Sequence, residues 1–339
     1  MNKKIIDLLA PYYAVSIIGM AKNAGKTTVL NRLVSAYDER GIIIGLTSIG
    51  RDGENVDVVT STDKPEIYVT KGTVVATAAE LLKKSDITKE ILKTTGINTP
   101  LGEVVFVRAK SDGNVQIGGG SINSQIAKLC GEFKEFGAEK VLIDGAVSRK
   151  TVSGPGITDA TILCTGAALS LDMDKVVEDT AFAASLLMLP PLCDEHAESL
   201  ISRLPESQCK VIAIMPGGEY VPVALDDPAY IKGQVSYIYI RGAVSDKVVE
   251  KLVMSNINLR GVKIIIDDGS KLFIKSNTFE KLKRKNSEIV VRRHINLVAL
   301  TVNPCSTCGL DFNKARFAEA MQKHISVPVF NVLDEEVMI

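Results

Sequence analysis

The sequence predicts an α/β protein of two domains, each built around a mostly parallel β-sheet. Short apolar runs alternate with longer amphipathic runs along most of the 339-residue chain, which is typical of strands connected by helices. Several apolar runs end in Gly or Asp, as strands do at a sheet edge that carries a site. A chain of this length also exceeds the usual size of one domain.

The composition is that of an ordinary globular protein, with 46% hydrophobic and 24% charged residues. Lys and Arg together number 40, as do Asp and Glu, so the formal net charge is zero. This balance argues against a general nucleic-acid or membrane-surface binder. No apolar run is long enough to span a membrane, and residues 1–13 lack the features of a signal peptide. We therefore expect a cytoplasmic protein with no membrane or nucleic-acid partner.

Residues 15–28 (VSIIGMAKNAGKTT) contain the most informative pattern in the chain. The apolar residues 15–18 predict a buried strand, and Gly25-Lys26-Thr27-Thr28 begins an amphipathic helix. A strand, a Gly-containing loop, Lys-Thr and a helix form a phosphate-binding loop, in which backbone N–H groups face phosphate oxygens. The alternative is a chance match, because a Gly-Lys-Thr sequence follows hydrophobic runs in unrelated proteins as well.

This pattern assigns a role to each residue of the loop. Lys26 would neutralise the outer phosphates and act in catalysis, and the Thr27 hydroxyl would bind Mg²⁺. The expected nucleotide-binding residues are Gly19, Lys22, Asn23, Ala24, Gly25, Lys26, Thr27 and Thr28.

Residues 42–49 predict a second buried strand, which ends in Gly50-Arg51-Asp52-Gly53-Glu54. Ligands bind beyond the carboxyl ends of strands in open α/β sheets, so Asp52 should lie near the phosphate-binding loop. It could bind Mg²⁺ or position the attacking nucleophile, and we count it as a catalytic and a metal-binding candidate. Glu54 is a weaker candidate. The alternative is a polar turn, since Gly and Asp favour turns in any context.

The apolar run at residues 140–143 predicts a strand that ends in Asp144-Gly145. Asp144 is the expected second Mg²⁺ ligand, and Gly145 would let the backbone approach the γ-phosphate. The alternative is a strand end with a solvated turn. Asp159, just before the strand expected at residues 161–165, is a weaker candidate for the same site.

Two further features allow either a functional or a structural interpretation. Residues 118–120 are three glycines before a predicted helix, and they form either a second anion site or a loop with Ser121 as the helix N-cap. Cys305 and Cys308 form a C-x-x-C pair, which supplies two ligands where zinc needs three or four. We favour two incidental thiols over a metal or redox site.

A predicted helix over residues 172–189 ends at Pro190-Pro191, a stiff connection at which we place the domain boundary. Residues 1–190 form the expected P-loop nucleotide-binding domain, and residues 191–339 form a C-terminal, Rossmann-like α/β domain. The second domain contains no phosphate-binding loop of its own. The basic run at residues 281–293 contains acidic residues as well and is expected to be a solvated face.

Through Gly19–Thr28, Asp52 and Asp144, the N-terminal half resembles P-loop NTPases of the dethiobiotin synthetase, cobyric acid synthase and MinD-like class. These proteins share the spacing of five residues between the two glycines of the loop, Gly19 and Gly25. The resemblance implies ATP and Mg²⁺ as ligands. MinD-type loops carry an additional lysine where this chain has Ala21, so the resemblance does not extend to dimerisation through that lysine.

The whole chain, with LIDGAVSRK and TDATILCTGA in one half and INLVALTVNP and VPVFNV in the other, resembles a second family. This is the P-loop subunit of the reactivating factor for adenosylcobalamin-dependent lysine 5,6-aminomutase. The resemblance implies ATP hydrolysis coupled to a conformational change on a protein partner, either the cobalamin enzyme or a second reactivase subunit.

Two alternative functions stay open. One is an ATP-dependent ligase or kinase whose C-terminal domain binds a small carboxylate or amine. The other is a nucleotide-binding module without hydrolysis. ATP is favoured over GTP because the sequence has no Asn-Lys-x-Asp guanine-recognition motif.

Overall fold

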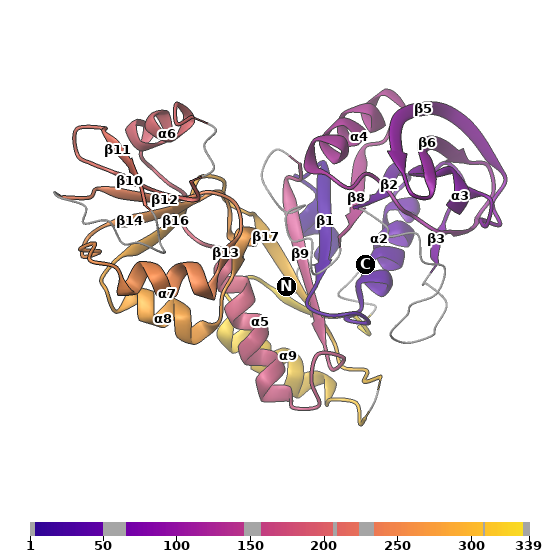
Figure 1. Cartoon of the computed structure of the whole chain (residues 1–339). Coiled ribbons are helices and arrows are strands. Elements are labelled where there is room, and N and C mark those ends of the chain that lie inside the picture. Colours follow the sequence, from indigo (N-terminus) through magenta and orange to yellow (C-terminus); the bar gives the residue numbers. More distant parts are fainter. Residues whose placement is uncertain are drawn as a thin grey trace. The chain divides into compact units, whose positions relative to one another are not determined.

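The computed structural model describes residues 4–49, 66–145, 157–205, 209–223, 234–307 and 309–334 (Figure 1). The chain forms two compact units. Unit 1 comprises Met1–Ala184 and Asn296–Ile339, and unit 2 comprises Ser185–Ile295. Each unit has a β-sheet with helices, and the larger sheet is mostly parallel, as the sequence predicts. Among the described residues, no helix is both long and apolar enough to cross a membrane.

Unit 1 contains a sheet of nine described strands. In spatial order these are β18 (Val329–Asn331), β17 (Leu297–Asn303), β9 (Ala160–Gly166), β1 (Ala14–Gly19), β8 (Lys140–Asp144), β2 (Ile44–Ser48), β4 (Val74–Ala78), β6 (Gly102–Ala109) and β5 (Lys89–Thr99). Neighbours from β18 to β4 are parallel, whereas β6 is antiparallel to both β4 and β5. The seven parallel strands therefore end at one edge, which we call the carboxyl edge of unit 1. β3 (Ile67–Val69) and β7 (Gly113–Val115) form a separate antiparallel pair.

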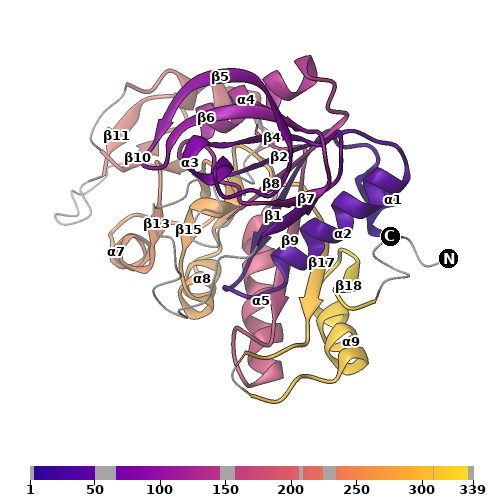
Figure 2. The ribbon, with the colours of Figure 1, turned by 90° about the vertical axis from the view of Figure 1, so that its right-hand side faces the viewer.

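The helices of unit 1 cover both faces of this sheet. They are α1 (Ile5–Leu9), α2 (Lys26–Glu39), α3 (Ala79–Leu82), α4 (Asn123–Glu135) and α9 (Lys314–His324), and α5 (Met173–Leu187) continues into unit 2. α1 and α2 lie side by side (Figure 2) and share a core with one face of β1 and β8. Phe133 of α4 packs on the other face with Val141 and Ile143. Alternate residues of β8 thus enter the two cores, which explains its continuous apolar sequence.

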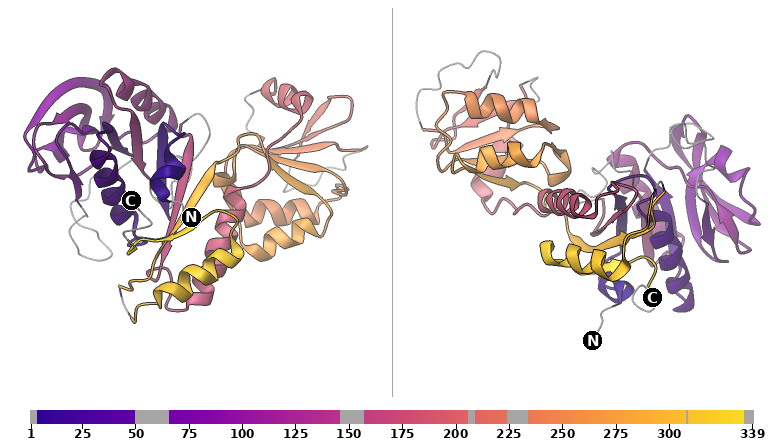
Figure 3. Two further views of the ribbon diagram at one scale, coloured as in Figure 1. Left: turned by 180° about the vertical axis from the view of Figure 1, so that it is seen from behind. Right: turned by 90° about the horizontal axis from the view of Figure 1, so that it is seen from below.

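The expected C-terminal domain of residues 191–339 is wrong at its C-terminal end. β17, β18 and α9 belong to unit 1, because β17 pairs in parallel with β9 and Thr301 lies opposite Cys164 (Figure 3). Unit 2 is thus an insertion between β9 and β17. Its start lies within α5, a few residues before the predicted boundary at Pro190-Pro191. A regular alternation of strands and helices identifies strands but not the sheet that each strand joins.

Unit 2 has a sheet with the spatial order β11 (Tyr220–Pro222), β10 (Val211–Ile214), β12 (Tyr237–Ile240), β14 (Lys263–Ile266) and β16 (Glu288–Val291). β12, β14 and β16 are parallel, and β10 is antiparallel to β12. The ends of the three parallel strands form the carboxyl edge of unit 2. α6 (Glu195–Ser202) lies on one face of this sheet, and α7 (Asp246–Met254) and α8 (Ser276–Lys283) lie on the other (Figure 1). A short pair, β13 (Val244–Ser245) and β15 (Leu272–Phe273), completes the unit with the 3-10 turn Gly269–Lys271.

Candidate functional site

The loop between β1 and α2, residues 20–25, contains two residues with a left-handed backbone conformation, a feature of many anion-binding loops. Asn23 and Gly25 are left-handed, with φ of 59° and 90°. Left-handed residues in a short loop turn successive N–H groups toward the same side. Gly25 is also the N-cap of α2 and has no side chain that could cap the first N–H groups of the helix. The loop and the helix N-terminus therefore present backbone donors together, as phosphate binding requires.

Both glycines of the predicted pattern are required by close contacts. A Cβ atom on Gly19 would lie 3.0 Å from Cδ of Lys26, so the glycine makes room for the lysine to fold back over the loop. A Cβ atom on Gly25 would lie 3.1 Å from Cβ of Asn303, in addition to the strain of a positive φ. Gly19 is thus favoured by the packing of Lys26, and Gly25 by its positive φ and the packing of Asn303.

The structure brings Lys26 and Asp144 together at the carboxyl edge of unit 1. β1 and β8 are adjacent, and Ile17 lies opposite Asp144. The Nζ of Lys26 donates to the carbonyl oxygen of Gly145 at 3.0 Å and lies 3.8 Å from Oδ1 of Asp144. Both side chains are partly exposed, at 21% and 36%. A solvent-accessible lysine and carboxylate therefore lie next to the loop, which is where the sequence predicts them.

Gly145 turns the chain closely across the end of β1. Its N–H donates to the Ile17 carbonyl oxygen at 2.9 Å, and a Cβ atom would lie 2.9 Å from Cγ2 of Ile18. A larger residue would displace this turn. Gly145 is thus explained by its close approach to β1, and its expected approach to a γ-phosphate stays a prediction.

The remaining predicted residues differ in their surroundings. Ala24 is buried in the core beneath the loop, so its side chain anchors the loop and only its backbone can face a ligand. Lys22 and Thr28 are exposed, and Thr27 is partly exposed in the first turn of α2. Asp52 and Glu54 lie outside the described residues.

The described residues at this edge offer few side-chain ligands for Mg²⁺. Among the described residues there is no group of three or more His, Cys, Asp or Glu that could hold a metal ion. The donors present, Thr27 and Asp144, nevertheless fit Mg²⁺, which usually takes one or two protein oxygens and completes its shell with phosphates and water. The residues thus fit a metal that arrives with a phosphate ligand.

Asn303 is a residue of this edge that the sequence did not identify. It ends β17, and its Nδ2 donates to the carbonyl oxygen of Asn23 at 3.2 Å. The available signal was the apolar run that ends in Asn303-Pro304. This run predicts the end of a strand, but the expected domain boundary placed that strand in the C-terminal domain.

Asp159 and Ser121 do not have the roles that the sequence predicts for them. Asp159 lies at the opposite edge of the sheet, where its Oδ2 accepts from the N–H groups of Tyr13 and Ala14 at 2.9 and 2.8 Å. The expected position of Asp159 beside Asp144 is wrong. Asp159 precedes β9 whereas Asp144 ends β8, so the two residues lie at opposite edges of the sheet. Ser121, the N-cap expected for α4 in the structural interpretation of residues 118–121, is not the N-cap, because Ile122 takes that position. Oε1 of Gln125 accepts from the Ser121 N–H at 2.9 Å.

The glycine triplet, residues 118–120, is explained by close packing. A Cβ atom on Gly119 would lie 2.2 Å from the Ser48 carbonyl oxygen at the end of β2. The Gly118 N–H donates to the Thr77 side-chain hydroxyl at 2.9 Å, and the Gly118 carbonyl oxygen accepts from the Ala78 N–H of β4 at 2.8 Å. No second anion site is needed to explain these glycines.

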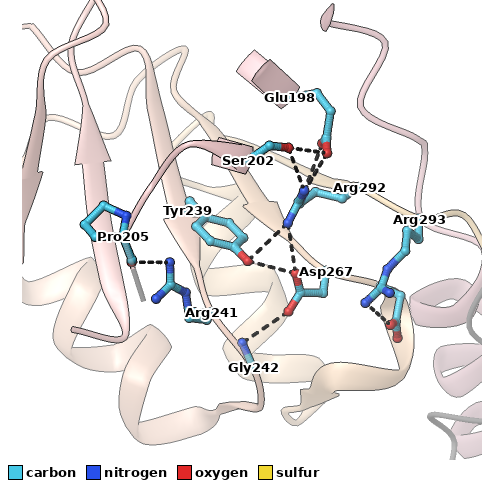
Figure 4. Close-up of polar contacts among 10 residues, drawn as sticks. Glu198, Ser202, Pro205, Tyr239, Arg241, Gly242, Asp267, Arg292 and Arg293 are labelled. Atoms are coloured by element: carbon cyan, nitrogen blue, oxygen red, sulfur yellow. Dashed lines mark hydrogen bonds and ion pairs between the residues drawn. The ribbon is translucent and has the colours of Figure 1, made fainter. Parts of the chain in front are cut away.

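The carboxyl edge of unit 2 holds a network of charged side chains (Figure 4). Arg292 follows β16, and its Nε donates to Oε2 of Glu198 in α6 at 2.9 Å. Its Nη1 lies 3.6 Å from Oδ1 of Asp267, which follows β14. The Tyr239 hydroxyl donates to the same Asp267 oxygen at 2.8 Å, and the Gly242 N–H donates to the other at 3.3 Å. This network links α6 to the ends of all three parallel strands.

The protonation equilibria of unit 2 reflect these contacts. The hydrogen bond from Arg292 is the main cause of the lowered pKa of Glu198. Burial, and then the charge of Asp267, raises the pKa of Tyr239. The side chain of Arg292 is only 23% exposed, so the expectation of a solvated basic face at residues 281–293 is wrong at this position.

The cysteines of the described chain include two buried thiols. Burial raises the pKa values of Cys130 and Cys164 to about 12 each, so both remain protonated and behave as small hydrophobic residues. Cys305 is partly exposed, and Cys308 lies outside the described residues, so their pairing stays a prediction.

Comparisons of the chain with protein-family models, with curated proteins and with solved structures found no match. Function is therefore inferred from the residues at the two carboxyl edges.

Proposed function

We propose that the chain binds a magnesium–nucleoside triphosphate at the carboxyl edge of unit 1 and hydrolyses it. The observation that carries this proposal is the β1–α2 loop, with left-handed Asn23 and Gly25 and with Lys26 folded back to Asp144. Backbone donors, a lysine and a carboxylate within a few ångströms are the elements of a triphosphate site.

In the proposed reaction, Lys26 exchanges its hydrogen bond with the Gly145 carbonyl oxygen for contacts with the β- and γ-phosphate oxygens. A hydrogen bond between two charged groups is stronger than one to a neutral carbonyl, so this exchange favours binding. Thr27 and Asp144 would hold Mg²⁺ directly or through water, and the metal would supply positive charge for the phosphates. Asp52 positions the attacking water in this proposal.

We further propose ATP as the nucleotide and a protein as the target of the reaction. The sequence lacks the guanine-recognition motif Asn-Lys-x-Asp, which favours ATP. The resemblance to a reactivating factor favours a partner such as a cobalamin-dependent aminomutase or a second reactivase subunit. The insertion of unit 2 before β17 supports such coupling, since β17 ends at Asn303 and Asn303 contacts the loop.

A ligase or kinase is the second candidate function. One observation favours it: unit 2 has a cavity of about 470 Å³ lined by polar residues that include Ser236, Arg260 and Lys263. Two cationic side chains could hold a small carboxylate there. The cavity is beside residues that begin β12 and β14, however, and ligands of α/β sheets usually bind at the carboxyl ends.

Steady-state release of inorganic phosphate distinguishes these functions. We expect slow hydrolysis of Mg-ATP by the wild-type protein, no hydrolysis by Lys26→Ala, and unchanged hydrolysis by Lys83→Ala, whose lysine pairs with Glu80 on the surface. Turnover that instead requires a small carboxylate or amine and yields a stoichiometric phosphorylated or ligated product would establish the ligase or kinase. Nucleotide binding without phosphate release would leave a non-hydrolysing module.

A further inference from the structure

We infer that Asn303 is a positioning residue for the nucleotide site, which holds residues 20–25 in the conformation that binds phosphate. This inference rests on the proposed function. Asn303 is far from the loop in sequence and precedes Pro304 at the end of β17. It would act through the backbone of the loop and not by contact with the reacting atoms.

Three hydrogen bonds fix the orientation of Asn303. Its Oδ1 accepts from the Cys305 N–H at 3.2 Å, and its backbone carbonyl oxygen accepts from the Ala167 N–H at 2.9 Å. With its oxygen held by Cys305, the side-chain amide presents its nitrogen to the carbonyl oxygen of Asn23 at 3.2 Å. The side chain therefore has one defined orientation, and its only donor group faces the loop.

Two glycines provide the space that Asn303 occupies. A Cβ atom on Gly166, at the end of β9, would lie 2.5 Å from the Asn303 carbonyl oxygen. A Cβ atom on Gly25 would lie 3.1 Å from Cβ of Asn303. Asn303 thus fits between the end of β9 and the loop, where the surrounding chain allows it little movement.

The hydrogen bond to Asn23 determines the direction of a donor that phosphate would use. The carbonyl group of Asn23 and the N–H group of Ala24 belong to one trans peptide and point in opposite directions. Holding the carbonyl group toward Asn303 therefore turns the Ala24 N–H away from Asn303, to the side on which the proposed phosphate would bind. Without this bond the peptide between Asn23 and Ala24 could rotate. Phosphate binding would then have to order that peptide, which costs conformational entropy.

Binding of Mg²⁺ with a non-hydrolysable ATP analogue, measured by calorimetry on the full chain, tests the inference. Asn303→Ala removes the donor, and we expect the Kd to rise about tenfold, which corresponds to one lost hydrogen bond near a charged ligand. Asn303→Leu keeps the branched shape and adds no charge but removes the donor, and we expect it to bind about as weakly as Asn303→Ala. A role in packing alone predicts the opposite order, with Asn303→Leu near wild type.

The matched control is Asn296→Ala, near the other end of β17. Asn296 makes the same kind of bond, from its Nδ2 to the Asp159 carbonyl oxygen at 2.9 Å, but at the opposite edge of the sheet. We expect its Kd to equal that of the wild type. Amide hydrogen exchange without nucleotide should be faster at residues 20–25 in Asn303→Ala only, which separates a local effect from general loss of stability.

Two results would overturn the inference in distinguishable ways. If the wild type binds the analogue and both Asn303 variants bind within twofold of it, Asn303 does not position the loop and the proposed function stands. If the wild type itself does not bind the analogue, the proposed function fails and the inference fails with it.

Discussion

The two carboxyl edges of this molecule have the same architecture but opposite chemistry. In unit 1, the strand ends surround a loop of backbone donors, and Lys26 bonds to a neutral carbonyl oxygen with its carboxylate neighbour at 3.8 Å. In unit 2, Arg292 already has Glu198 and Asp267 as partners. Both edges are places where α/β sheets bind ligands, but the central cation of the unit 2 edge already has carboxylate partners, whereas Lys26 of unit 1 bonds to a neutral oxygen.

The comparison shows that the position of a site and the capacity of its charged groups to bind a ligand have separate causes. Topology determines where strand ends gather. Whether charges there bind a ligand depends on whether the chain's own groups already satisfy them, because a saturated charge gains little from a new partner. The predictions below test this difference from its largest consequence to its smallest.

Lys26→Ala should have the largest effect on nucleotide binding. Loss of a charge-assisted contact to phosphate costs about 1.5–3 kcal/mol, so the Kd for Mg-ATP should rise about 10- to 100-fold. The thermal stability of the nucleotide-free protein should change little, because Lys26 is partly exposed and bonds to a carbonyl oxygen. Calorimetric titration and a melting curve check both parts, and unchanged affinity would contradict the role of Lys26.

Arg292→Ala should affect stability and leave nucleotide affinity unchanged. The variant leaves Asp267 and Glu198 without their cationic partner, which should destabilise unit 2 by about 1–2 kcal/mol after allowance for the exposure of Glu198. Amide exchange at β12 and β14 in increasing urea reports on this unit. The control Lys281→Ala removes an exposed pair with Glu250 and should cost no more than about 0.5 kcal/mol. Equal destabilisation by the two variants would show that the network contributes no more to the stability of unit 2 than an exposed ion pair does.

Acid should weaken the same network. Because Arg292 lowers the pKa of Glu198 below its ordinary value of 4.5, the folded state favours the carboxylate. The contribution of Glu198 to stability is therefore complete above about pH 4.5 and is lost as the pH falls through the folded-state pKa. In Glu198→Gln, the protection factors of β12 amides, from which the intrinsic pH dependence of exchange is removed, should depend less on pH in this range. An unchanged dependence would exclude Glu198 as a cause.

Asn23→Gly should have the smallest effect. Glycine adopts the left-handed φ of 59° without strain, and the carbonyl group that Asn303 contacts is retained. The Kd for Mg-ATP should stay within about twofold, whereas Asn23→Ala should weaken binding about fivefold because alanine is strained there by about 1 kcal/mol. Complete loss of binding in Asn23→Gly would mean that the Asn23 side chain itself contacts the ligand.

Local sequence patterns predicted the parts of the site that depend on short-range order. The apolar residues 15–18 and 140–143 are strands, and the Gly25-Lys26 step begins a helix, because each has a local cause in periodicity or capping. The rule that parallel strands share a carboxyl edge then placed Lys26 and Asp144 together. Asp52 lies outside the described residues and stays a prediction.

Long-range pairing could not be predicted in the same way. Asn303 reaches the loop only because β17 joins the sheet of unit 1, and nothing in residues 297–303 specifies that partner. Arg292 belongs to a run that contains several other basic residues, and its low exposure depends on α6, which precedes it by many residues. Both were missed because their environment is built by distant segments.

Amide hydrogen exchange of the whole chain, with and without Mg²⁺ and a non-hydrolysable ATP analogue, tests the central claim most directly. Protection by the nucleotide should appear at residues 19–28 and at Gly145, and should be absent at residues 241–242 and 267–269 of unit 2. Protection confined to the carboxyl edge of unit 2, or no change at residues 19–28 at saturating nucleotide, would contradict the claim.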